Sequence, residues 1–245
     1  MPRGFGSIKA AASRFSGGSG NVVYFKLPKD GDSATVRFLE EGDEVFGYWY
    51  HDFTHIDKKN GWKSKVACLD QDDDGTPCPG CEEDMPRKFQ GLINIIWRNG
   101  PVYGKDSEGN IDWDNQKGTG DVVAVWRQGI NVFGKTLARK DVTYKGLSSR
   151  DFEITREGQG LSNTSYSVEP VVIDGETKAV ALSADDKKLA KEKYDLEEIA
   201  RLKIDYDDAQ KFINKKLSEF NDDDSDDDDD DVSGFLKKQP FNDDE

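Results

Sequence analysis

The chain is poor in the residue types that build disulfides, metal sites and membrane spans. Its 245 residues include only three cysteines, two histidines and two methionines. With the cysteines confined to one short window, none is left to form the disulfide framework of a small secreted protein. No apolar run approaches the roughly 18 residues that a membrane-spanning helix needs, and no apolar segment typical of a signal peptide is visible. These absences predict a soluble protein of a reducing compartment.

Basic residues are also scarce relative to acidic ones, and the imbalance is concentrated near the C-terminus. The net charge is −15, and residues 221–245 alone hold 12 acidic and 2 basic residues. Such a segment cannot bury apolar surface, so we predict a disordered acidic tail. One interpretation is a solvating tail. The other, which we favour, is a nucleic-acid mimic that competes for a basic groove and carries a partner-binding tip built from Phe235, Leu236 and Phe241.

Four of the five cysteines and histidines lie within 27 residues. The set His55, Cys68, Cys78 and Cys81 has intervening gaps of twelve, nine and two residues. Structural zinc takes Cys₃His sets, and the Pro-Gly turn between the last two cysteines lets both thiolates reach one metal ion. The sequence therefore predicts one structural zinc ion. His51 is the alternative fourth ligand, but it falls on an aromatic strand, so we prefer His55.

Other interpretations of this window fail on spacing. The run from Asp70 to Gly75 begins like an EF-hand loop, but its twelfth position is Cys81 where a glutamate is required. A zinc deaminase needs a His-x-Glu motif, which neither histidine provides. A thioredoxin-like pair lacks the strand-to-helix context, and Cys68 argues against it. Four protein ligands leave no open metal position, so we expect no enzymatic activity.

The hydrophobic pattern predicts about seven short strands, which favours a small β-barrel or sandwich. A long exposed loop is expected over 99–120, a short helix over 130–141, a capping box from Ser183 to Asp186, and a helical stripe from Leu196 to Phe220. The expected strands span residues 22–27, 34–39, 46–53, 92–97, 122–126, 151–155 and 165–172.

Aromatic residues lie beside cations on several of these strands and in the cysteine window. Single-stranded nucleic acid binds by stacking its bases on aromatic faces while a positive groove follows its backbone. The pattern therefore predicts a single-strand interface, although any one of these aromatic side chains can instead belong to the core. The predicted stacking residues are Tyr48, Tyr50, Trp62 and Trp97, and the predicted phosphate contacts are Arg37, Lys63, Lys65, Arg98 and Arg127.

Taken in order, these features resemble a known family. They are the basic N-terminal arm, the strand Ala34–Leu39, the His-x₁₂-Cys-x₉-Cys-x₂-Cys ligand set, the strand that begins Leu-Ile-Asn-Ile at Leu92, and the acidic tail. The chain is similar to the single-stranded DNA-binding proteins of tailed phages, of the T-even helix-destabilising type. The zinc spacing is the specific part of the resemblance, which spans nearly the whole chain.

The resemblance implies a mainly β fold with some helix: an OB-fold-like barrel with a zinc-binding insertion, C-terminal helices and a disordered acidic tail. It further implies that His55, Cys68, Cys78 and Cys81 hold zinc. The expected organisation is a flexible basic arm over 1–20, an OB-fold core over 21–182 with a zinc subdomain at about 52–90, a helical segment over 183–220 and the acidic tail over 221–245.

The expected function is to coat single-stranded DNA, without strong sequence preference, during phage DNA replication, recombination and repair in the cytoplasm of the infected host. The tail would recruit replication and recombination proteins. The arm lacks the compact Lys-Arg cluster that the family uses for contacts between protomers, so the sequence leaves self-association on DNA open. The alternative function is a zinc-binding adaptor for protein–protein interactions, with the aromatic strands serving a protein partner.

Overall fold

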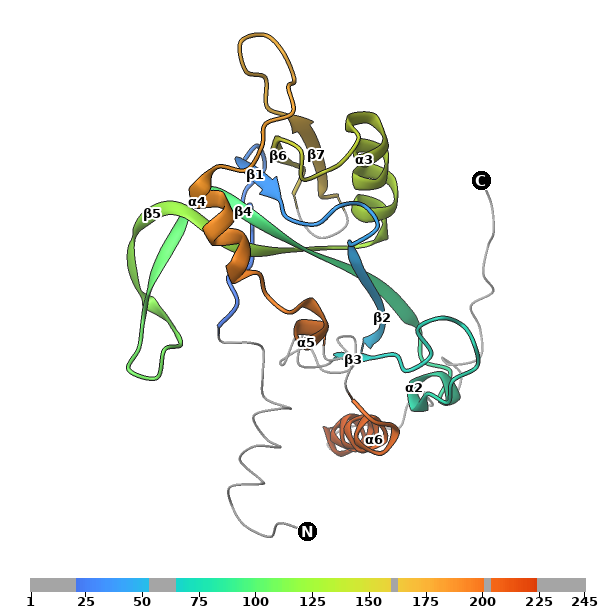
Figure 1. Ribbon diagram of the computed structural model, residues 1–245. Coiled ribbons are helices and arrows are strands. Elements are labelled where there is room, and N and C mark those ends of the chain that lie inside the picture. The colour runs from blue at the N-terminus through green and yellow to red at the C-terminus, as the bar shows by residue number, and fades with distance from the viewer. Residues whose placement is uncertain (1–20, 53–64, 160–162, 201–203, 224–245) are drawn as a thin grey trace.

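An antiparallel sheet of seven strands forms the centre of the molecule (Figure 1). The structure is a computed structural model, and it describes residues 21–52, 65–159, 163–200 and 204–223. Along the sheet the strands follow the order β3-β2-β4-β1-β6-β7, and β5 pairs with β4. The fold is therefore mainly β with some helices, as predicted. The strands are β1 (Ser33–Phe38), β2 (Phe46–Asp52), β3 (Lys65–Ala67), β4 (Arg87–Lys105), β5 (Ile111–Gln128), β6 (Asp151–Glu157) and β7 (Ser165–Pro170).

The long strand β4 organises the sheet because it has neighbours along its whole length. Its beginning pairs with β2, its middle with β1, and its other edge with β5. Alternate residues of β4 point into the main core, where Ile93 and Ile95 meet the fully buried Phe38, Trp126 and Phe152. This core is closed by the π-helix η2 (Asn131–Leu137) and by α3 (Ala138–Tyr144).

Helix η2 packs closely against the sheet at Gly91. A Cβ atom added to Gly91 would lie 2.5 Å from the Phe133 ring, so only glycine leaves room for this side chain. Neighbouring residues of a strand point to opposite faces. The helices η2 and α3 therefore cover the face of β4 opposite to the one that Gln90 and Leu92 occupy.

The C-terminal helices cover that second face. They are α4 (Ala184–Leu189), the 3₁₀ helix η3 (Ala190–Glu192) and α5 (Leu196–Ala200). The predicted capping box at Ser183 and Asp186 is confirmed, with both hydrogen bonds present. Leu196 and Ala200 pack on Leu92 and its neighbours, so this segment lies across the middle of the face (Figure 1).

A smaller unit gathers around β3 beside the end of β2. It contains the short helix α2 (Pro79–Glu82) and the long helix α6 (Tyr206–Asp223). Ala209 and Ile213 of α6 pack on Val66 of β3, and Tyr206 donates a hydrogen bond from its hydroxyl to Glu82. The apolar stripe predicted from Leu196 onward thus belongs to two helices with different packing sites. Helix α5 packs on the sheet, and α6 packs on this smaller unit.

Two predictions about the strands were wrong. The segment 99–120 is not a loop. Its residues extend β4 and β5 into a two-stranded ribbon, in which backbone hydrogen bonds hold the polar residues together (Figure 1). The segment 22–27 is not a regular strand, since it joins β5 only through Tyr24 and two backbone hydrogen bonds between Val125 and its neighbours Val23 and Phe25.

No helix in the described part of the chain is long and apolar enough to cross a membrane.

Candidate metal centre and nucleic-acid interface

Three thiols and one imidazole converge beside the start of β4. The side chains are those of His51, Cys68, Cys78 and Cys81, and their ligand atoms all lie within 4.8 Å of one another. Cys68 Sγ is 3.8 Å from Cys78 Sγ and 3.6 Å from Cys81 Sγ. His51 Nε2 is 3.4 Å from Cys78 Sγ and 3.7 Å from Cys81 Sγ.

These separations match the edges of a tetrahedral zinc site. Bond lengths of about 2.3 Å to sulfur and about 2.05 Å to nitrogen give ligand separations of about 3.8 Å between sulfurs and about 3.6 Å between sulfur and nitrogen. The measured separations scatter closely around both values. The cluster can therefore hold one metal ion, and its donor set is compatible with zinc.

The sheet register explains why these four residues meet. The pairing of β2 with β3 sets His51 opposite Val66, and Cys68 follows two residues later, directly after the end of β3, where its N–H donates to the Trp49 carbonyl oxygen. Helix α2 then supplies Cys81, with Cys78 at the residue before its start. Gly80 permits the contact, because an added Cβ atom would lie 2.4 Å from His51 Cδ2.

Hydrogen bonds around the cluster orient its ligands. His51 Nδ1 lies 3.2 Å from the Met85 carbonyl oxygen, and a proton on Nδ1 that donates to this oxygen leaves the Nε2 lone pair free for a metal. The Leu69 backbone N–H donates to Cys78 Sγ over 3.3 Å. Gln71 bridges the turn after Cys68 to the backbone of Trp49. These hydrogen bonds thus orient the ligand atoms toward one another.

Burial is the main influence on the pKa values of the cluster. Burial lowers the pKa of His51 and thereby favours the neutral imidazole that a metal requires. Burial, together with the neighbouring thiols, raises the pKa of Cys81 to about 12. Burial acts to raise the pKa of Cys78 as well, but the backbone N–H groups of Leu69, Cys81 and Gly80 outweigh it and lower the pKa. A bound dication would offset the repulsion between thiolates.

The histidine of the cluster is His51, whereas the spacing of the sequence favoured His55. The residue His55 lies outside the described residues. The three predicted cysteines are brought together, and His51 completes four ligand positions without it. The ligand set is therefore revised to His51, Cys68, Cys78 and Cys81, because strand pairing and not sequence distance places the histidine.

A second group of side chains lies on the face of β2, β3, β4 and β5 that is opposite to η2 and α3. Directly opposed residues of antiparallel strands share a face. Tyr50 is opposite Lys88, Asp52 is opposite Lys65, and Leu92 is opposite Arg127. These pairings gather the basic aromatic patch, defined here as Tyr48, Tyr50, Lys65, Lys88 and Arg127.

Rings and cations alternate within this patch. The Tyr48 and Tyr50 ring centroids are 6.0 Å apart, and Lys65 Nζ lies 4.7 Å from the Tyr50 ring centroid. Arg127 lies 5.1 Å from the ring centroid of Tyr24. Tyr50 is buried and supports Lys65, whereas Tyr48 is partly exposed and Lys88 is exposed. Tyr48 also packs against the cluster that contains Leu92 and Leu196. The part of the patch that reaches solvent thus combines the uncovered part of Tyr48 with Lys88 and the half-buried Lys65 and Arg127.

The patch has more positive than negative charge. Burial lowers the pKa of Lys65, and the nearby Arg127 and Lys88 lower it further, while Asp52 acts in the opposite direction. Lys88 Nζ lies 3.1 Å from the Asp52 carboxylate. Three cations therefore surround one carboxylate, and an incoming anion such as a phosphate would stabilise the charged form of Lys65.

Two predicted phosphate contacts have structural roles instead. Arg37 is 2% exposed and donates to Asp151 and to the carbonyl oxygens of Ser148 and Val180. Arg98 donates to three carboxylates, which belong to Asp121, Asp151 and Asp186. Neither guanidinium faces the basic aromatic patch, because both form ion pairs with carboxylates from distant parts of the sequence. Arg37 and Arg98 are therefore not part of the proposed nucleic-acid interface.

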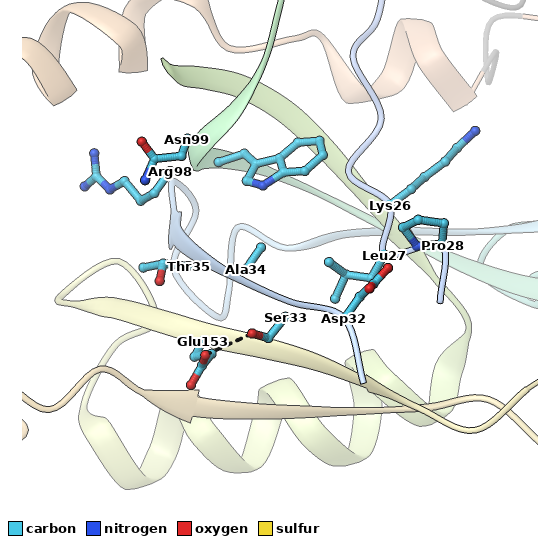
Figure 2. A pocket seen from close by; sticks show the side chains of 11 residues that line it. Lys26, Leu27, Pro28, Asp32, Ser33, Ala34, Thr35, Arg98, Asn99 and Glu153 are labelled. Carbon is cyan, nitrogen blue, oxygen red and sulfur yellow. Dashed lines mark hydrogen bonds between the residues drawn. The ribbon is translucent and has the colours of Figure 1, made fainter. Parts of the chain in front are cut away.

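Trp97 is separated from the patch as well. Trp97 points into the core face of β4, where its ring meets Phe25 edge to face at a centroid distance of 4.9 Å. It lines an open cavity of about 530 Å³ between the start of β1 and the 26–28 segment, together with Lys26, Asp32 and Glu153 (Figure 2). This cavity also contains two carboxylates, so it does not extend the positive surface. The predicted residues Trp62 and Lys63 and the tail residues Phe235, Leu236 and Phe241 lie outside the described residues.

Sequence reasoning missed Lys88, Gln90 and Tyr24. Lys88 and Gln90 stand in a polar stretch that begins β4, and only their pairing with Tyr50 and Tyr48 brings them to the patch. The Tyr48 hydroxyl donates to Gln90 Oε1 over 3.2 Å. The alternation of Lys88, Gln90 and Leu92 is the signal that could have predicted a shared face.

Scans against protein-family models and against curated proteins find no match to the chain. The functional interpretation therefore depends on the geometry of its own residues.

Proposed function

We propose that the protein binds single-stranded DNA without strong sequence preference and is not an enzyme. The observation that carries this proposal is the basic aromatic patch, where the partly exposed Tyr48 ring lies among Lys65, Lys88 and Arg127. A ring offers a stacking surface that every base can use, and cations along it neutralise phosphates. No base-specific pocket is needed for such binding.

The fold supports this function. Strands β1, β4, β5, β6 and β7, with the helices η2 and α3 inserted between β5 and β6, are consistent with a five-stranded, partly open barrel of the OB type. OB-folds bind single strands on the face of their central strands. Lys88 and Arg127 of the patch lie on β4 and β5, which would be the second and third strands of such a barrel, and β2 adds Tyr48 and Tyr50 beside them.

The metal centre lies directly next to the patch. His51 follows Tyr50 in β2, and Lys65 stands three residues before Cys68. We propose that one zinc ion here is structural. It would fix β3 against β2 and thereby hold Lys65 above the Tyr50 ring. The metal would thus support DNA binding by holding Lys65 in place, without taking part in a reaction.

The wider role rests on the resemblance to the phage helix-destabilising proteins. With His51 in place of His55, the gap before Cys68 grows from twelve to sixteen residues, but the chain keeps a Cys₃His set, a β core and an acidic tail in the same order. We propose a role in coating DNA during phage replication, recombination and repair in the host cytoplasm, with the acidic tail recruiting partner proteins.

The salt dependence of binding tests the patch. Each neutralised phosphate of a single strand contributes about −0.7 to the slope of log K against log salt. Replacing Lys65, Lys88 and Arg127 by alanine should therefore make the slope less steep by about 2. The matched control replaces three exposed cations on the opposite face, namely Lys135, Arg139 and Lys145.

Fluorescence anisotropy of a labelled 30-nucleotide oligo-dT at several salt concentrations gives both slopes. Circular dichroism and zinc content confirm that the variants are folded. The patch variant should lose affinity and slope while the control keeps both. If the two variants behave alike, the patch is not the interface. If the unmodified protein does not bind the oligonucleotide, the function as a zinc-binding adaptor for proteins replaces this proposal.

A further inference from the structure

The ribbon formed by residues 98–121 has a paired aromatic surface far along β4 from the basic aromatic patch. Tyr103 of β4 and Trp113 of β5 have ring centroids 4.9 Å apart at an interplanar angle of 60°. Trp113 is 46% exposed, although tryptophan is usually well buried. The exposed Trp113 ring and the half-buried Tyr103 ring thus form one aromatic pair on an otherwise polar ribbon.

The ribbon departs from regular pairing to present this tryptophan. Tyr103 is opposite Gln116, and the next residue, Gly104, is opposite Asp112. The residues 113–115 are therefore left outside the ladder as a bulge that contains Trp113. Bulges lose backbone pairing, and proteins use them to re-aim a side chain. Here the bulge brings the indole against the Tyr103 ring.

Two charged residues of the ribbon, Lys105 and Asp112, lie on opposite faces. Tyr103 and Lys105 alternate onto one face, and Ile111 joins them because it is opposite Lys105. Asp112 is opposite Gly104 and so points to the other side. Lys105 is exposed and makes no ion pair within the described part of the chain. The aromatic face thus carries a cation, as the basic aromatic patch does.

A second bulge aligns this face with the patch. Trp97 is opposite Val122 and Gly100 is opposite Gly120, so Arg98 and Asn99 share one partner position. Asn99 has a left-handed backbone (φ 55°) at this point. The extra residue shifts the alternation of β4 by one. Arg127 and every second residue of β5 down to Thr119 lie on one face, and Thr119 is opposite Pro101. A further register shift, between Val102 and Tyr103, places its extra residue, Lys117, in β5 and leaves the alternation of β4 unbroken. Tyr103 therefore lies on the same face of β4 as Pro101, which is the face of Arg127.

We propose that Tyr103, Trp113 and Lys105 form a second stacking site for the same single strand. This inference rests on the proposed DNA-binding function and deepens it. The two sites lie on one sheet face. Leu189 of α4 and Ala190 of η3 pack on Ile96 and Val123 between them, whereas α5 packs on Leu92 beside Tyr48. A short oligonucleotide occupies the basic aromatic patch alone, whereas a long one continues across to the ribbon and stacks a base on Trp113.

The length dependence of affinity tests the second site. The full chain, its Trp113→Ala variant and its Lys105→Glu variant are titrated with oligo-dT of 6, 12 and 24 nucleotides at one fixed salt concentration. The control is Ile130→Ala, which truncates a side chain that is 53% exposed outside the ribbon. Zinc content and circular dichroism verify folding, and sedimentation without DNA reports the oligomeric state.

The unmodified protein and the control should gain affinity with length. Trp113→Ala should leave the affinity for the 6-mer unchanged and lower that for the 24-mer about 10-fold, as expected for one lost stacked base. Lys105→Glu should have the same pattern. Equal length dependence in all four proteins overturns the second site while the proposed function stands. A change of oligomeric state in Trp113→Ala overturns it too, in favour of a contact between protomers. Absence of binding by the unmodified protein at every length overturns the proposed function as well.

Discussion

Replacement of His51 by alanine should abolish stoichiometric zinc binding, whereas replacement of His55 should not. His51 is fully buried, and its Nε2 atom completes a tetrahedron whose other corners are three sulfurs. Loss of a group that hydrogen-bonds to a metal ligand typically lowers metal affinity about 10- to 100-fold. Loss of a ligand itself should therefore cost at least about 100-fold, or about 2.7 kcal/mol.

The same substitution removes a buried ring that packs against Gly80. Large-to-small changes of this kind destabilise a core by about 2–5 kcal/mol. Zinc content of the purified protein, competition with a chromophoric chelator, and the melting temperature with and without chelator measure these effects. The chain has only two histidines, so His55→Ala is the matched control.

We expect one zinc ion per chain in the unmodified protein and in His55→Ala, with a melting temperature that falls on chelation in both. His51→Ala should hold less than one ion and should melt lower even with zinc present. Full zinc content in His51→Ala together with loss in His55→Ala would restore the ligand set favoured by the spacing. No zinc in the unmodified protein, and no response to a chelator, would refute the metal centre.

Three further predictions follow from single contacts. Burial and the nearby Arg127 lower the pKa of Lys65, and a bound phosphate favours its protonated form, so affinity for oligo-dT should fall as pH rises through this lowered pKa. Lys65→Arg should move that fall to higher pH in a titration series. The Arg98 guanidinium lowers the pKa of Asp186 to about 2. The stability that this pair contributes is present above the unfolded-state pKa of about 4 and is lost as pH falls from about 4 to about 2. Asp186→Asn should cost about 1–3 kcal/mol at neutral pH in urea unfolding and should abolish this pH dependence. Gly80→Ala should weaken zinc binding in chelator competition because its Cβ atom would meet His51; unchanged affinity would show that α2 can move aside.

The local patterns of the sequence predicted where strands and helices lie better than they predicted which of these elements pair with one another. Alternating residues predicted β1 and β2, and Ser183 with Asp186 predicted the start of α4. The ribbon over 99–120 was missed because its glycines and polar residues are typical of loops, whereas pairing between β4 and β5 stabilises it. Backbone hydrogen bonds between two strands leave little trace in the composition of either.

The candidate site shows the same limit. The three cysteines were predicted from their spacing, but the histidine depends on the register of β2 with β3. Arg37 and Arg98 looked like phosphate contacts because they stand beside aromatic and apolar residues. Their carboxylate partners Asp151 and Asp186 lie more than fifty residues away in the chain, so the ion pairs become visible only in the fold.

Direct binding of a single strand tests the central claim. Fluorescence anisotropy of a labelled 30-nucleotide oligo-dT is titrated with the full chain at 50 and 200 mM salt (about the range over which phosphate contacts lose most of their affinity), with a matched labelled duplex as the control. The account predicts a rise in anisotropy with the single strand, an affinity that falls steeply at the higher salt concentration, and almost no response with the duplex. Equal binding of duplex and single strand, or no response to either, would contradict it.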